Sequence, residues 1–207
     1  MRLVLLPVLL APLILAGCGL NRNPLRVERS ACPAVGVLEY AGEATLFSPA
    51  GSRDADAIDV TAAITNVRST CFEQSDTIVS NATYEVVATR MQAAGARTVT
   101  LPVFSAVVRG GDRLLSKDIG SVTLQFADGA LTASAQSSAQ SSIARSAATL
   151  PDDINREIDR RRKPGDPDAA IDPLARPEVR NAVREATFEV LLGFNLDEPA
   201  LAYNVAK

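Results

Sequence analysis

The sequence has no histidine and no tryptophan, and aromatic residues make up only 4% of its 207 residues. The lack of histidine excludes Ser-His-Asp and Cys-His catalysis and every zinc site with a histidine ligand. The low aromatic content argues against a surface on which nucleic-acid bases or sugar rings stack. The formal net charge of -3, from 21 Lys and Arg and 24 Asp and Glu, provides no basic excess for phosphate contacts. We therefore predict that nucleic acid is not a partner.

The chain also lacks the local motifs of several enzyme and metal sites. Its serines stand outside any GxSxG or SxxK motif, and no CxxC motif is present. Asp54, Asp56 and Asp59 lack the glycine and the distal glutamate of a calcium loop. Glu39 and Glu43 could be taken for a glycosidase pair, but a chain with 24 acids contains many such pairs. We predict no catalytic residue, no metal ligand and no cofactor, and hence a protein that is not an enzyme.

The apolar run Leu3–Leu15 follows the single charge of Arg2 and is too short for a membrane-spanning helix, which needs about 20 residues. It predicts a secretory signal peptide over residues 1–17. The run ends in Leu15-Ala16-Gly17-Cys18, which resembles the lipobox of bacterial lipoproteins. That resemblance implies cleavage between Gly17 and Cys18, and a diacylglycerol group on the Cys18 thiol. An ordinary signal peptide with an incidental cysteine is the alternative.

An acylated Cys18 would anchor the chain in a lipid bilayer, because two or three acyl chains bind a membrane far more stably than one. The next residue, Gly19, is not the aspartate that retains lipoproteins in the inner membrane of enterobacteria. By this resemblance we expect the protein at the outer membrane, facing the periplasm. Residues 18–31 are polar and without periodicity, and predict a flexible tether.

Without Cys18, two cysteines remain, Cys32 and Cys71. An even number of cysteines in an oxidising compartment predicts a disulfide. Closing a loop of about 40 residues would stabilise the fold by roughly 4 kcal/mol in the chain-entropy model. Two buried free thiols are the alternative.

Apolar and polar residues alternate with a period of two in several stretches of residues 32–207, which predicts half-buried strands. The clearest stripe is Ala186–Leu196, and Asp128-Gly129 is a hairpin signal. The fold predicted is a mainly β, single Ig/fibronectin-III-like antiparallel β-sandwich of about seven strands. The strands are expected within residues 35–47, 58–65, 82–90, 98–109, 122–126, 131–135 and 186–196.

An insert at about 135–185 is expected before the last strand. It begins Ser/Ala/Gln-rich, continues with a predicted helix over residues 151–163 and ends in a proline-rich loop. The basic run 160–163 could contact lipid or lipopolysaccharide phosphates, but the acids before it favour a solvated helix end. Because such a segment buries little apolar area, we expect it to be the variable part of a binding surface, or else an ornamental loop.

The two ends of the folded part carry the most specific motifs. Cys32-Pro33-Ala34-Val35, with Gly193-Phe194-Asn195-Leu196 and Leu201-Ala202-Tyr203-Asn204, resembles a family of small uncharacterised alphaproteobacterial outer-membrane lipoproteins. The resemblance implies an envelope location and a sandwich-like fold. We expect a non-catalytic, membrane-anchored accessory or scaffold protein of the cell envelope, with a possible envelope protein partner. The alternative is a binding module for peptidoglycan, lipopolysaccharide or a protein.

Overall fold

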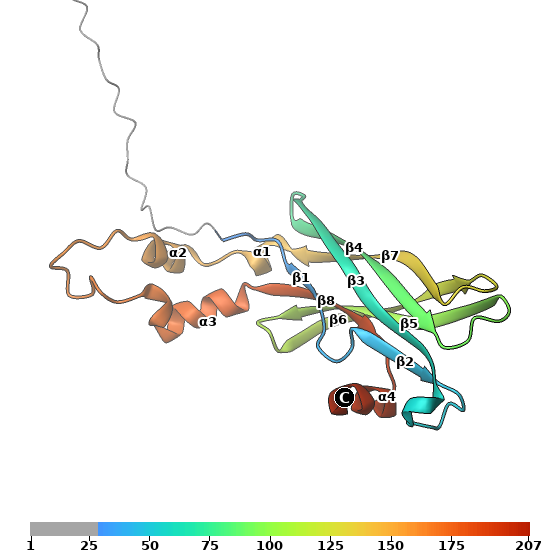
Figure 1. The fold of residues 1–207 in the computed structure, drawn as a ribbon. Helices are drawn as coiled ribbons and strands as arrows, with labels where there is room; N and C mark the ends of the chain where they lie inside the picture. The colour runs from blue at the N-terminus through green and yellow to red at the C-terminus, as the bar shows by residue number, and fades with distance from the viewer. Residues whose placement is uncertain (1–28) are drawn as a thin grey trace, which may run out of the picture.

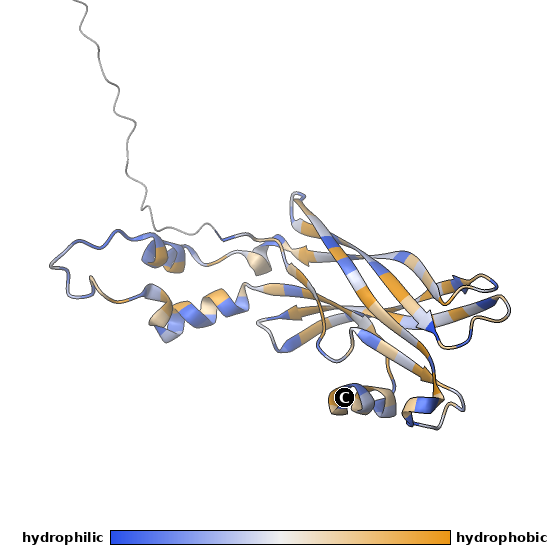
Figure 2. Cartoon of the chain, viewed as in Figure 1, coloured by the Kyte–Doolittle hydropathy of each residue, from blue (hydrophilic) through white to orange (hydrophobic). Residues whose placement is uncertain are grey.

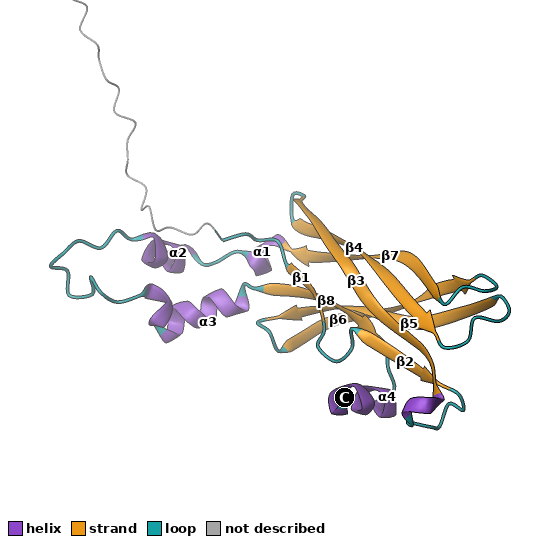
Figure 3. Ribbon diagram, viewed as in Figure 1, coloured by secondary structure: helices purple, strands orange, loops and turns teal. Residues whose placement is uncertain are grey.

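The computed structural model describes residues 29–207 and shows two four-stranded sheets packed face to face (Figure 1). The predicted signal peptide, the cleavage site at Gly17 and the acylation site at Cys18 lie outside the described residues, as does most of the predicted tether. Strands dominate the chain and helices are few (Figure 3). The predicted β-sandwich with a helical insert before the last strand is confirmed.

Each sheet mixes strands that are distant in sequence. One sheet has the order β1-β8-β5-β6, and the other β2-β3-β4-β7. The first comprises β1 (Ala34–Val37), β8 (Phe188–Phe194), β5 (Arg97–Arg109) and β6 (Arg113–Phe126). The second comprises β2 (Glu43–Phe47), β3 (Ile58–Glu73), β4 (Thr77–Arg90) and β7 (Thr132–Ala144).

Residues 29–207 form eight strands rather than seven because the expected strand over 35–47 is broken in two. Tyr40 adopts a left-handed backbone conformation, with φ of 61°, between β1 and β2. A residue in that conformation cannot continue an extended strand, so the chain turns and passes to the other sheet. The apolar pattern of residues 35–47 does not predict this turn.

The connectivity from β3 to β8 follows the immunoglobulin pattern. The neighbours β3-β4-β7 and β8-β5-β6 correspond to strands A-B-E and F-C-C′ of that sandwich. Beside β8, where the last immunoglobulin strand would pair, lies β1. It runs parallel to β8, with Ala34 opposite Glu189 and Val37 opposite Leu192.

The core lies between the two sheets, because every second residue of the long strands points inward. On β4 this alternation buries Tyr84, Val86 and Ala88 and leaves the residues between them more exposed. Figure 2 shows the resulting mixture of apolar and polar residues along the strands. The predicted last strand is central, since Phe188, Val190, Leu192 and Phe194 are all at most 4% exposed.

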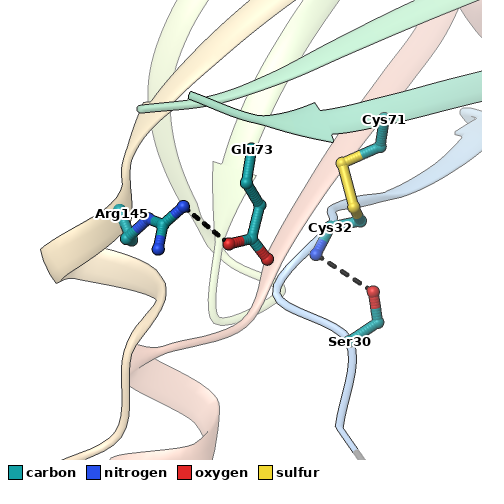
Figure 4. Close-up of a disulfide and its surroundings, with 5 residues drawn as sticks. All are labelled: Ser30, Cys32, Cys71, Glu73 and Arg145. Atoms are coloured by element: carbon teal, nitrogen blue, oxygen red, sulfur yellow. Dashed lines mark hydrogen bonds and ion pairs between the residues drawn. A yellow bond between two sulfur atoms is a disulfide. The ribbon is translucent and has the colours of Figure 1, made fainter. Parts of the chain in front are cut away.

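Cys32 and Cys71 form the predicted disulfide, with their Cα atoms 6.0 Å apart. Figure 4 shows the bond between the segment that precedes β1 and the C-terminal end of β3, near the Glu73–Arg145 ion pair. Since β1 pairs with β8 of the other sheet, the bond links the N-terminal strand of one sheet to the body of the second.

The predicted start of the insert, at about residue 135, is wrong. Residues 132–144 continue β7 as an edge strand, paired with β4 from Thr89 to Thr77. Small alternating Ser, Ala and Gln side chains suit such an edge, where one face meets the core and the other meets water. The insert therefore begins at Arg145. It contains α1 (Arg145–Ala148), α2 (Asp152–Asp159), the 3-10 turn η2 (Pro173–Ala175) and α3 (Pro177–Glu185).

Candidate ligand pocket

A cavity of about 500 Å³ opens at one end of the sandwich. It lies between β2, the first part of β5, the end of β8 and the C-terminal helix α4 (Glu198–Ala206). We call it the β2–α4 pocket. Asp197 caps α4, with its Oδ1 accepting a hydrogen bond from the Ala200 N–H at 2.9 Å. This cap positions Ala200 on the wall of the pocket.

The floor of the β2–α4 pocket is the end of the main core. Ala44, Leu101 and Phe194 line the pocket and belong to the buried core cluster, each at most 4% exposed. Leu46 and Leu196 are partly buried and extend this apolar lining. The floor thus offers hydrophobic surface contributed by strands of both sheets.

An ion pair between the sheets stands at the rim. Both terminal nitrogens of Arg97, on β5, donate to the Asp59 carboxylate on β3, at 2.7 and 2.6 Å. These hydrogen bonds, and the positive charge of Arg97, lower the pKa of Asp59 against the opposing effect of burial. The pair is bidentate, which fixes the distance between the two strands at this edge.

Arg53 is the other cation at the rim. Its Nη1 donates to the carbonyl oxygens of Ala50 and Ser52, at 2.9 and 2.6 Å, and its guanidinium lies 5.0 Å from the ring centroid of Phe47. Phe47 in turn meets the Tyr203 ring of α4 edge-on. Among the described residues, no carboxylate forms an ion pair with Arg53.

A second, smaller cavity of about 350 Å³ lies between the turn that joins β1 to β2 and the C-terminal end of α4. Asn204, 6% exposed, donates from Nδ2 to the carbonyl oxygens of Tyr40 and Glu43, both at 2.8 Å. Lys207 contacts the Glu43 carboxylate at 2.5 Å. Asn204 thereby fixes the turn between β1 and β2, so these contacts explain the motif in structural terms.

The insert contains its own charge network. Arg160, Arg162 and Arg176 surround the carboxylates of Glu157 and Asp168, with Arg162 to Glu157 at 2.7 Å and Arg176 to Asp168 at 2.9 Å. Burial alone would raise the pKa of Asp168, but Arg160 and Arg162 lower it overall. Two bases of the run 160–163 thus form ion pairs with carboxylates of the insert itself. This favours the interpretation of the run as a solvated helix end.

The carboxylates considered from the sequence do not converge. Glu39 is exposed in the turn before β2, and Glu43 is exposed at the first position of β2. Asp54 precedes the 3-10 turn η1 (Ala55–Ala57), and Asp59 pairs with Arg97. Within residues 29–207, no group of three or more potential metal ligands occurs. In the same range, no helix is long and apolar enough to cross a membrane.

Sequence reasoning missed the residues of the β2–α4 pocket. Arg53, Arg97 and Ala200 come from three separate elements, and none lies in a recognisable motif. The only signal was the clear core stripe that ends at Phe194 and Leu196, followed by the capping residue Asp197.

No family model, no curated protein and no solved structure matches the chain. The resemblance to alphaproteobacterial lipoproteins therefore stays a prediction.

Proposed function

We propose that this protein is a lipid-anchored, non-catalytic accessory or scaffold protein of the bacterial cell envelope, facing the periplasm. The observation that carries the proposal is the Cys32–Cys71 disulfide. Of the three cysteines, two are joined to each other, and the third is Cys18 of the Leu-Ala-Gly-Cys sequence. Structural disulfides persist in oxidising compartments, so the bridge and the predicted signal peptide support the same location.

The test is metabolic labelling with radioactive palmitate in a bacterial host. We expect the wild-type chain to carry the label and to fractionate with outer membranes. Cys18→Ser should lose the label completely and accumulate as an uncleaved precursor. The matched control is Cys71→Ser, which removes another cysteine and should keep the label.

Labelled Cys18→Ser protein would disprove acylation at this residue. A labelled wild-type chain that sediments with inner membranes would contradict only the outer-membrane location. Cys71→Ser protein without label would mean that the labelling depends on the fold rather than on Cys18.

A binding module for an envelope ligand is the second candidate. The β2–α4 pocket supports it, because pockets with an apolar lining and a few converging polar groups are the usual form of small-molecule sites. The two proposals are compatible, since an anchored scaffold can present such a pocket.

A further inference from the structure

The β2–α4 pocket combines an apolar floor with a cation that lacks an anionic partner. Leu101 and Phe194 of the floor are 2% and 1% exposed, and Arg53 stands at the rim. We propose that this pocket binds a single-chain amphiphile with a carboxylate head group, that is, a fatty acid. Its hydrocarbon chain would lie on the floor, and its carboxylate would bind the Arg53 guanidinium.

The charges at the rim favour an anionic head group. Two of the four charged side chains, Arg97 and Asp59, neutralise each other in a bidentate pair. Asp197 keeps its negative charge but lies at the first turn of α4, where its Oδ1 accepts a hydrogen bond from the N–H of Ala200 and the helix N-terminus partly offsets it. Arg53 donates to the neutral carbonyl oxygens of Ala50 and Ser52, and no described carboxylate pairs with it, so it is the rim cation that can donate to an anionic ligand. A hydrogen bond between a guanidinium and a carboxylate is among the stronger polar contacts in proteins.

The size of the pocket favours one hydrocarbon chain. Its volume of about 500 Å³ falls within the range typical of small-molecule sites, about 300–1,000 Å³. A lipid with two chains and a large head group would exceed the lining between β2 and α4. Burial of the hydrocarbon chain against Leu101 and Phe194 would supply the main driving force, because removing methylene groups from water is favourable.

Binding can be measured by isothermal titration calorimetry with laurate, below its micelle concentration. The protein would be the full mature chain carrying Cys18→Ser, secreted behind a cleavable signal, so that no detergent competes. This format does not require acylation of Cys18, so a failure here is distinguishable from a failure of the proposed function. We expect one laurate per chain and much weaker binding of dodecanol, which lacks the charge.

A pair of variants on α4 tests the location. Ala200→Trp should fill the pocket and abolish laurate binding, because Ala200 lines it. Ala202→Trp places the same bulk on an exposed part of α4 outside the lining and should bind like wild type. Circular dichroism of both variants establishes that the fold is kept. Equal laurate affinities of the two variants would overturn the proposal.

A second pair tests the head-group contact. Arg53→Gln should weaken laurate binding about tenfold through loss of one charge-assisted hydrogen bond. Arg68→Gln is the matched control, because Arg68 is also exposed and donates only to a neighbouring carbonyl, that of Val67. An unchanged affinity of Arg53→Gln would refute the role of Arg53. The absence of saturable laurate binding to the wild-type chain would refute the pocket as a fatty-acid site.

Discussion

Arg90, at the end of β4, is buried, with 2% of its surface exposed, and no carboxylate in the described part of the chain pairs with it. Its guanidinium donates to four backbone carbonyl oxygens at 2.6 to 2.9 Å, those of Ala93, Gly95, Ala127 and Ala130. It also lies 5.2 Å from the centroid of the Phe126 ring. One side chain thus fixes the β4–β5 and β6–β7 connections to each other.

We predict that Arg90→Met lowers the free energy of unfolding by about 3 kcal/mol, because buried carbonyl oxygens would lose their donors. Arg90→Lys should recover only part of this, since an ammonium cannot reproduce the planar fork of a guanidinium. Urea unfolding measures both changes. The control Arg68→Met, on an exposed arginine, should stay within about 0.5 kcal/mol of wild type. A similar loss in the control would show that the effect is not specific to the buried site.

The Asp59–Arg97 pair predicts a pH dependence of stability. Because Arg97 lowers the pKa of Asp59 in the folded state, the pair stabilises the fold above the unfolded pKa of about 3.9. That contribution is lost as the pH falls through the lower, folded pKa. Asp59→Asn should therefore destabilise by at most about 1 kcal/mol at pH 7, since Arg97 is partly exposed.

The difference between wild type and Asp59→Asn should shrink towards zero below pH 3.9, as thermal unfolding over a pH series can show. Asp118→Asn, on the exposed part of β6, controls for the loss of one negative charge. A difference that persists unchanged at low pH would indicate that the asparagine disturbs packing rather than an ion pair.

At the scale of elements, the insert joins the core at both of its ends. Ala148 of α1 and Val179 of α3 are 2% and 1% exposed, and Leu150 is 7% exposed. The segment between them is held by the network around Glu157 and Asp168 rather than by apolar packing. The two ends of the insert therefore pack against the core, whereas the segment between them contributes little to it.

We predict that replacing residues 151–176 by a short Gly/Ser linker leaves a folded chain that retains the Cys32–Cys71 disulfide. Melting temperature and thiol titration measure this. Extending the replacement to residues 146–184 also removes Ala148, Leu150 and Val179, and should destabilise the sandwich. If the shorter replacement already unfolds the protein, the ion network is part of its structural core.

Periodicity predicted strands whose side chains alternate between buried and more exposed positions, such as β4. It predicted the first residues of β7 but missed residues 136–144, because a strand of Ser, Ala and Gln has too little contrast in hydropathy between its two faces. It also failed for the turn at Tyr40, whose backbone conformation depends on hydrogen bonds from Asn204, 164 residues further along the chain. The disulfide was predictable because only two cysteines remained once Cys18 was assigned to the lipobox.

At the scale of the whole molecule, the insert and the β2–α4 pocket lie at opposite ends of β5. Arg97, the first residue of β5, stands at the pocket, and Arg109, the last, contacts Glu185 at the end of α3. Thirteen residues of strand separate them, which corresponds to about 40 Å. Arg29 donates to the carbonyl oxygen of Ala148, so the segment that precedes β1 lies at the insert end. The pocket therefore lies at the end of the sandwich remote from Arg29.

The disulfide also determines how the molecule would bear a mechanical load. A pull applied to the chain ahead of Cys32 reaches Cys32 before it reaches β1. At Cys32 the tension passes through the covalent bond to Cys71 and enters the C-terminal end of β3, which pairs along most of its length with β4. The load therefore does not pass through β1, which has only four residues and few hydrogen bonds to hold it against β8. A load applied ahead of Cys32 would therefore leave in place the strand that covers the edge of β8.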